Sequence, residues 1–99
     1  MSVRRGEMLR RLPATVTVAN QNERLVFKLV FANKTGREFR ALTETCTLGQ
    51  ILVALIESWD SDYPLSIQGF EELEDEHPGT CDALLVAYHK TRAVSLEGN

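Results

Sequence analysis

Three consecutive segments near the start of the chain predict a β-hairpin: Ala14-Thr-Val-Thr-Val-Ala19, Asn20-Gln-Asn-Glu23 and Arg24-Leu-Val-Phe-Lys-Leu-Val-Phe-Ala32. In the two outer segments apolar side chains recur at every second position, which is the spacing of a strand with one buried face. The polar residues between them suit a turn. A turn of this length sets Val18 opposite Leu25 and Val16 opposite Phe27, so both strands of the predicted hairpin present their apolar residues on one face.

A third strand is predicted at Arg37-Glu-Phe-Arg-Ala-Leu42. The preceding Asn33-Lys-Thr-Gly36 has the asparagine and the glycine of a type I turn closed by a left-handed glycine. With this loop, Phe31 lies opposite Phe39 on the same apolar face. The first part of the chain therefore predicts an antiparallel three-stranded β-meander.

The next segment predicts a helix from Leu48 to Trp59. Thr47 and Gln50 have the spacing of a capping box, in which the Thr47 hydroxyl accepts from the Gln50 backbone N–H and the Gln50 side chain reaches back to the Thr47 backbone N–H. Apolar residues then recur at helical spacing and form one stripe: Leu48, Ile51, Leu52, Leu55, Ile56 and Trp59.

Two further helices are predicted after it. Ser66 can cap a short helix that points Phe70 and Leu73 inward and its acidic residues into water. Pro78 ends this helix or begins the next one. The final helix carries its apolar residues on one side: Cys81, Leu84, Leu85 and Tyr88. The predicted fold class is α+β, with an N-terminal antiparallel three-stranded β-meander packed against about three C-terminal helices.

Length and composition fit one domain. The chain has 99 residues, of which 43% are hydrophobic and 25% charged, as in ordinary globular proteins. We expect a flexible basic arm over 1–12, a single α+β domain over 13–94 and a frayed tail over 95–99. No apolar run reaches the length of a membrane span, and the first residues lack the apolar region of a secretory signal. Two cysteines make no disulfide framework, which favours a reducing compartment.

Charge is unevenly distributed along the chain. Residues 1–40 hold nine Lys and Arg against three acids, whereas residues 41–99 hold two against eleven. This polarity favours a partner recognised through charge, or head-to-tail self-association, although a solvated surface with internal pairing also accounts for it. The acidic total of −3 disfavours nucleic acid, while the basic first forty residues keep it as an alternative.

No pattern for catalysis or for a cofactor stands out. The possible metal ligands are Cys46, His77, Cys81 and His89, and they show none of the usual metal-binding spacings. Cys81 lies near a helix N-terminus, which can lower the pKa of a thiol, but a buried small apolar residue is the preferred interpretation. The acids of 71–76 lack a calcium-loop pattern, and no glycine-rich phosphate loop occurs. We expect no enzyme, no metal and no cofactor.

Residues suited to protein contact are easier to find. If helices cover the Phe27 face of the sheet, Val26 and Val30 lie on its outside and flank Lys28, which would suit a partner or self-association patch. Trp59, with Asp60 and Tyr63 close behind it, is a candidate contact anchor, because Trp and Tyr dominate interface hot spots. The alternative is that Trp59 is a core residue at the end of its stripe.

Several short motifs over about residues 25–93 resemble those of phage and prophage tail assembly chaperones. They are a strand hairpin, a helix ending in Ile56-x-x-Trp59-Asp60, the sequence Pro64-Leu65-Ser66 before a short acidic helix, and a final helix after Pro78 containing Ala83-Leu84-Leu85-x-Ala87-Tyr88. The resemblance carries over no catalytic residue, and it implies that Trp59, Asp60, Pro64 and Leu65 mark the fold.

The resemblance implies a binding function. It implies a protein made in the cytoplasm of the bacterial host, which coats the tape measure protein of the tail, is displaced by the tail tube protein and is absent from the mature virion. It also implies possible self-association and, in several phages, a longer form made by frameshifting. Two alternatives stay open: a small regulatory or nucleic-acid-binding protein that uses the basic N-terminal region, and a tail structural or completion protein.

Overall fold

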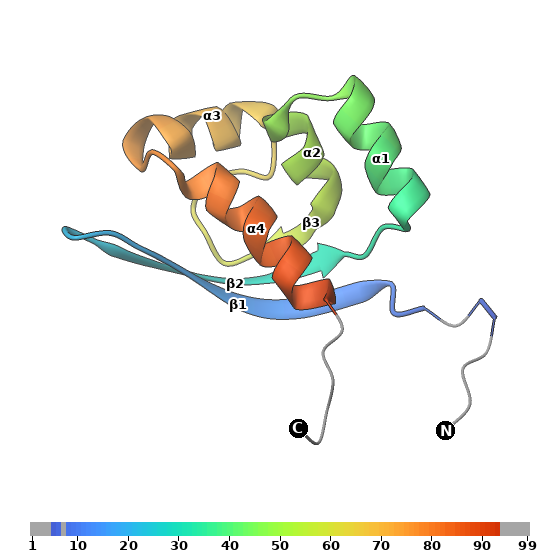
Figure 1. The fold of residues 1–99 in the computed structure, drawn as a ribbon. Helices are drawn as coiled ribbons and strands as arrows, with labels where there is room; N and C mark the ends of the chain where they lie inside the picture. Colours follow the sequence, from blue (N-terminus) through green and yellow to red (C-terminus); the bar gives the residue numbers. More distant parts are fainter. Residues whose placement is uncertain (1–4, 7, 94–99) are drawn as a thin grey trace, which may run out of the picture.

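The computed structural model describes residues 5–6 and 8–93 (Figure 1). Three strands and four helices follow one another in the chain: β1 (Arg11–Ala19), β2 (Arg24–Ala32), α1 (Gly36–Thr45), α2 (Leu48–Leu55), β3 (Ile56–Trp59), α3 (Ile67–Glu76) and α4 (Thr80–Arg92). The α+β prediction is confirmed, with four helices where about three were expected. β1 begins at Arg11, within the stretch predicted as an arm, and the predicted tail over 95–99 lies outside the described residues.

The predicted first hairpin is confirmed residue by residue. β1 and β2 are antiparallel, with Val18 paired to Leu25 and Val16 paired to Phe27. The polar turn is closed by the Asn20 backbone N–H, which donates to the Glu23 carbonyl at 3.0 Å. The alternation of the sequence therefore set both the register of the hairpin and the face that it buries.

The predicted third strand over 37–42 is wrong, because this segment forms helix α1. Thr35 and Glu38 make a capping box, in which the Thr35 hydroxyl accepts from the Glu38 N–H and the Glu38 carboxylate accepts from the Thr35 N–H. These hydrogen bonds satisfy free N–H groups of the first turn and start a helix where a β-turn was expected. Phe39 consequently stacks on Tyr88 of α4, at 5.8 Å between ring centroids, and does not face Phe31.

The third strand comes instead from the end of the predicted long helix. The Thr47–Gln50 capping box is present as predicted, but α2 ends at Leu55 and the chain continues as β3. β3 pairs antiparallel with β2, setting Trp59 opposite Leu29, with an irregularity in register between Val30 and Phe31. The sheet order is thus β1-β2-β3, with both neighbours of β2 antiparallel to it.

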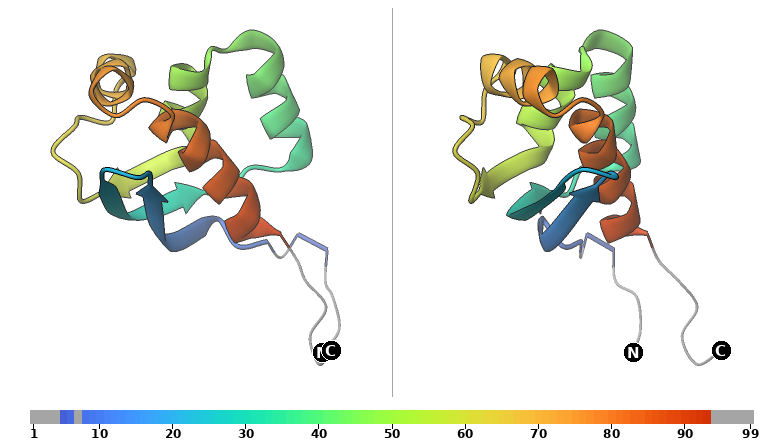
Figure 2. Two further views of the ribbon diagram at one scale, coloured as in Figure 1. Left: turned by 60° about the vertical axis from the view of Figure 1, so that its left-hand side comes forward. Right: turned by 90° about the vertical axis from the view of Figure 1, so that its left-hand side faces the viewer.

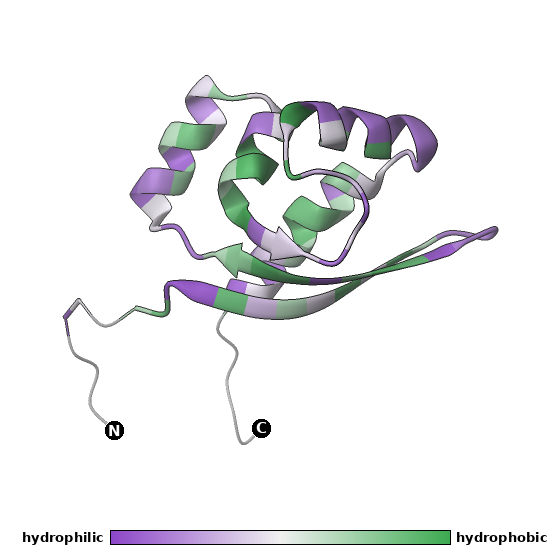
Figure 3. Ribbon diagram, turned by 180° about the vertical axis from the view of Figure 1, so that it is seen from behind, coloured by the Kyte–Doolittle hydropathy of each residue, from purple (hydrophilic) through white to green (hydrophobic). Residues whose placement is uncertain are grey.

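All four helices lie on one side of the sheet, and the three views in Figures 1 and 2 agree on this arrangement. α4 packs on β1 and also contacts α2 and α3. The core between the layers is formed by fully buried side chains of both, among them Phe31, Leu52, Leu55, Leu84 and Tyr88. Figure 3 shows the apolar colouring concentrated on β2, α2 and α4, and largely polar colouring on α3.

Side-chain hydrogen bonds hold the start of α3 and its short connection to α4. Ser66 caps α3 as predicted, accepting from the Gly69 N–H at 3.0 Å. Near the other end of α3 the Glu74 carboxylate accepts from the N–H groups of Gly79 and Cys81, at 2.6 and 3.1 Å. These bonds hold the pKa of Glu74 below its usual value and place a negative charge at the N-terminus of α4, where the helix dipole favours it.

Candidate functional site

The helix-free face of the sheet is the main surface on which the structure places predicted binding residues. The hairpin pairs Thr17 with Val26, Thr15 with Lys28 and Pro13 with Val30, and these side chains point away from the helices. Val26 is 50% exposed, Lys28 is exposed and Val30 is half-buried. The structure therefore confirms that the two valines lie on the outside of the sheet and flank Lys28. We call this surface the open face.

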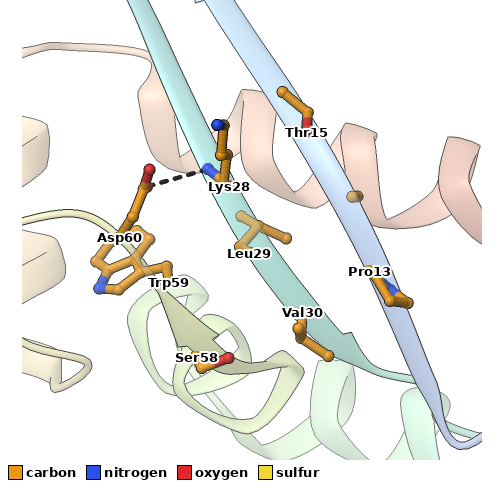
Figure 4. A pocket seen from close by; sticks show the side chains of 9 residues that line it. Pro13, Thr15, Lys28, Leu29, Val30, Ser58, Trp59 and Asp60 are labelled. Atoms are coloured by element: carbon orange, nitrogen blue, oxygen red, sulfur yellow. Dashed lines mark hydrogen bonds between the residues drawn. The ribbon is translucent and has the colours of Figure 1, made fainter.

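A shallow hollow of about 560 Å³ crosses the open face from β1 to β3 (Figure 4). Its lining includes four of the predicted residues together with side chains from all three strands: Pro13, Ala14, Thr15, Lys28, Leu29, Val30, Ser58, Trp59 and Asp60. Its form suits a contact spread over a surface better than an enclosed small molecule, for which proteins build deep pockets.

Asp60 joins β3 to β2 at the rim of this hollow through two hydrogen bonds. Its carboxylate Oδ1 accepts from the Lys28 backbone N–H at 3.0 Å, and its own N–H donates to the Lys28 carbonyl at 3.1 Å. The pairing between β2 and β3 is thereby extended one residue past Trp59. Asp60 thus holds the backbone from which the Lys28 side chain projects, a positioning role that its place in the sequence alone did not indicate.

Trp59 packs on the helix side of the sheet. Its ring stacks on Phe27 at 5.5 Å and meets Phe70 at 5.3 Å, both between centroids. Its indole N–H donates to the Tyr63 carbonyl at 2.9 Å. Because the ring is fixed among core aromatics and the polar N–H is satisfied, the structure places Trp59 with the core, as the alternative interpretation held.

Tyr63 lies at a second hollow, of about 280 Å³, which it lines together with Val26 and Asp60. Its hydroxyl donates to the Glu76 carboxylate, and this hydrogen bond raises the pKa of Tyr63 to about 12 because the ionised phenol would face a negative charge. Asp60 lines both hollows. The predicted residues thus form one neighbourhood around Asp60, with Trp59 on its inner side.

Five residues of the larger hollow were not predicted as site residues from the sequence: Pro13, Ala14, Thr15, Leu29 and Ser58. Pro13 and Thr15 follow from the hairpin register once their partners Val30 and Lys28 are chosen. Ser58 had no such signal, because its segment was assigned to a helix and its pairing with Val30 is a contact between distant parts of the chain.

Cys81 shows no sign of an activated nucleophile. Cys81 is buried, its Sγ–H points to the Phe70 carbonyl at 3.6 Å, and burial raises the pKa of the Cys81 thiol to about 12. The nearby Glu74 carboxylate adds to this effect, so the lowered pKa considered for this thiol is not found. The structure places Cys81 as a buried apolar residue.

Two other features bear on the class of protein. Within residues 5–6 and 8–93, no three His, Cys, Asp or Glu side chains gather as they would around a metal ion. Over the same residues, no helix has the length and apolar character needed to cross a membrane. Comparisons with protein-family models, curated proteins and solved structures found no match.

Proposed function

We propose that this protein is a non-catalytic phage tail assembly chaperone that binds the tape measure protein through the open face of its sheet. The observation that carries the proposal is the position of Val26 and Val30, which lie beside Lys28 on a sheet face that no helix within residues 8–93 covers. The two hydrogen bonds between Asp60 and the Lys28 backbone hold this surface in place. Apolar side chains beside an exposed cation suit a surface that meets a partner.

The size of the surface suggests how it would work on a long partner. A hollow of this size on a three-stranded sheet covers only a few turns of a helix, so one copy would bind weakly. Many copies along one extended helix would shield its apolar stripe from water. Contacts between neighbouring copies would raise their overall affinity for the helix. Weak individual contacts would also let the tail tube protein displace the copies as it assembles.

Residues of the motifs that resemble tail assembly chaperones make contacts within the fold. The last part of the predicted helix, Ile56–Trp59, is strand β3, which corrects the helical expectation for that motif. Trp59 donates to the Tyr63 carbonyl, and the Pro64 carbonyl accepts from the Ser66 N–H at 2.9 Å, just before α3. Their roles in joining β3 to α3 agree with the implied role as fold markers.

Co-expression with the tape measure protein of the same genome tests the proposal. We expect the two proteins to copurify, and Val26→Asp to abolish copurification because a charge would enter the apolar contact. Val86→Asp is the matched control, since Val86 is 51% exposed on α4, away from the open face. Equal copurification of the two variants, or a gene with no tail genes around it, would contradict the proposal. Retention of nucleic acid at low salt would instead favour the regulatory alternative.

A further inference from the structure

Within the described part of the chain, helix α1 and its two caps form hydrogen bonds only among themselves, over residues 35–46. Thr35 and Glu38 cap the first turn, and at the other end the Cys46 N–H donates to the Leu42 carbonyl at 2.9 Å. The threonine hydroxyls of α1 donate to carbonyls of the same helix. The ion pairs found among the described residues also lie elsewhere. Apart from the chain at its two ends, only the packing of side chains therefore holds α1 on the molecule.

The packing of α1 against the core is shallow. No residue of α1 is buried. Three half-buried side chains at helical spacing pack against the core, and they are Phe39, Leu42 and the cap residue Cys46. Leu42 also borders a hollow of about 330 Å³, so this side of the helix is incompletely packed. Figures 1 and 2 show α1 at the edge of the helical layer, beside α2 and away from α3. Detachment of α1 would therefore break few apolar contacts.

Phe39 makes the main contact between α1 and α4. Its ring stacks on Tyr88 at 5.8 Å and meets His89 edge to face at 4.9 Å, both between centroids. Tyr88 has other partners, because Phe31 packs against its ring at 5.5 Å and its hydroxyl accepts from the Lys34 N–H at 3.0 Å. Tyr88 and His89 together are called the aromatic site here. The aromatic site keeps its shape when Phe39 leaves it.

Both ends of α1 are joined to the molecule by extended residues. Thr35 precedes the helix and Cys46 follows it in this conformation, and Thr47 then begins the separate capping box of α2. We propose that α1 detaches as an intact helix and that the aromatic site then binds an amphipathic helix of a partner protein in its place. The occupant that the site holds in this structure defines the chemistry of that partner. It is a helix with an aromatic residue and, three positions later, an aliphatic residue on the same face, as Phe39 and Leu42 are in α1.

The partner helix competes with α1 for the aromatic site. Because α1 is tethered, its effective concentration at the site is about millimolar. The apparent affinity for a partner is reduced by the fraction of molecules in which α1 is attached. A partner helix longer than the ten residues of α1 overcomes this difference by burying more apolar surface. Any change that weakens the contact of α1 should therefore strengthen the binding of a second helix.

Amide hydrogen exchange of the native chain tests the detachment. We expect the amides of α1 to exchange together, at least about a hundredfold faster than those of β2 and α4, because they open without global unfolding. Phe39→Ala should speed exchange in α1 about tenfold and leave β2 and α4 unchanged. Arg40→Ala, at an exposed position of the same helix, is the control and should change exchange by no more than about twofold. Equal protection of α1 and α4 in the native chain, or loss of protection throughout the Phe39→Ala variant, would overturn the detachment.

A synthetic peptide with the sequence of residues 34–47, blocked at both ends, tests the aromatic site. We expect it to bind the Phe39→Ala chain at least about tenfold more tightly than the wild type and to shift the NMR signals of Tyr88 and His89. A peptide with Phe39→Ala and Leu42→Ala is the control and should not bind. Equal affinity for the two chains, no binding at millimolar peptide, or shifts on the open face instead would overturn the assignment of the site. Since no tail protein is present, the outcome is independent of the proposed function.

Discussion

Gly69 is the position at which we expect the addition of a single methyl group to disturb the fold. A Cβ built on Gly69 lies 1.9 Å from the Pro64 carbonyl oxygen and 2.9 Å from its carbonyl carbon. That oxygen also accepts from the Ser66 N–H at 2.9 Å, so it is held in place by the cap of α3. The obstacle is backbone, and it cannot rotate aside as a flexible side chain would.

Two effects of Gly69→Ala oppose each other. In an unobstructed helix alanine is favoured over glycine by about 1 kcal/mol. Overpacking a filled site typically costs about 1–3 kcal/mol and occasionally more, and an approach as close as this one belongs to the upper end. We expect the free energy of unfolding to fall by about 2 kcal/mol or more, because the loop from Pro64 to Ser66 must move away from α3.

Gly49→Ala is the matched control for this prediction. Gly49 is also helical, but its added Cβ would meet only Ile67 Cγ2, at 3.8 Å, which is an ordinary contact. We expect this variant to be as stable as the wild type or more stable, by up to about 1 kcal/mol. In urea titrations, with a slope of about 1–2 kcal/mol per molar, the Gly69→Ala midpoint should fall by about 1–2 M. A midpoint at or above the wild-type value would refute the steric reasoning.

Three further predictions concern the cap of α1, the buried thiol and the dependence of stability on pH. Thr35→Ala removes the capping box with Glu38, and we expect the free energy of unfolding to fall by about 1 kcal/mol and amide hydrogen exchange to become faster within α1 only. Unchanged amide exchange in α1 would show that the cap does not stabilise the helix. At pH 8 a thiol reagent should modify Cys46 but reach Cys81 only on unfolding, and reaction of both in the native chain would contradict the burial. As the pH rises from 9 towards 12, the unfolded chain loses the Cys81 proton while the folded chain keeps it, so the urea midpoint of unfolding should fall. The raised pKa of Tyr63 lowers the midpoint in the same way above pH 10. A midpoint that does not change with pH over this range would count against both pKa shifts.

The first hairpin shows what local pattern can determine. Alternation of threonine and valine in β1, and of apolar and other residues in β2, defines one buried face for each strand, and the polar turn between them fixes the register. The same alternation placed Val26 and Val30 on the face opposite Phe27, which is the outside of the sheet when helices cover the Phe27 side. Part of the candidate site was therefore readable from neighbouring residues alone.

Segment 36–45 shows where local pattern divides. Phe39 and Ala41 alternate as in a strand, whereas Phe39 and Leu42 have helical spacing. The predicted strand over 37–42 has only six residues, which are too few to distinguish the period of a strand from that of a helix. Thr35 and Glu38 carried the deciding signal, a capping box that the glycine-containing turn pattern obscured. Packing of Phe39 on Tyr88 then gives the helix its place on α4.

The hairpin, the cap of α2 and the inward sides of α3 and α4 were predicted correctly, because each depends on residues within a few positions of one another. The change of Ile56–Trp59 from helix to strand β3 was not predictable in this way, since the backbone hydrogen bonds that this segment gains come from β2, which lies far earlier in the chain. Those bonds carry Asp60 to Lys28 and complete the open face, so the contact surface exists only after the distant strands have paired.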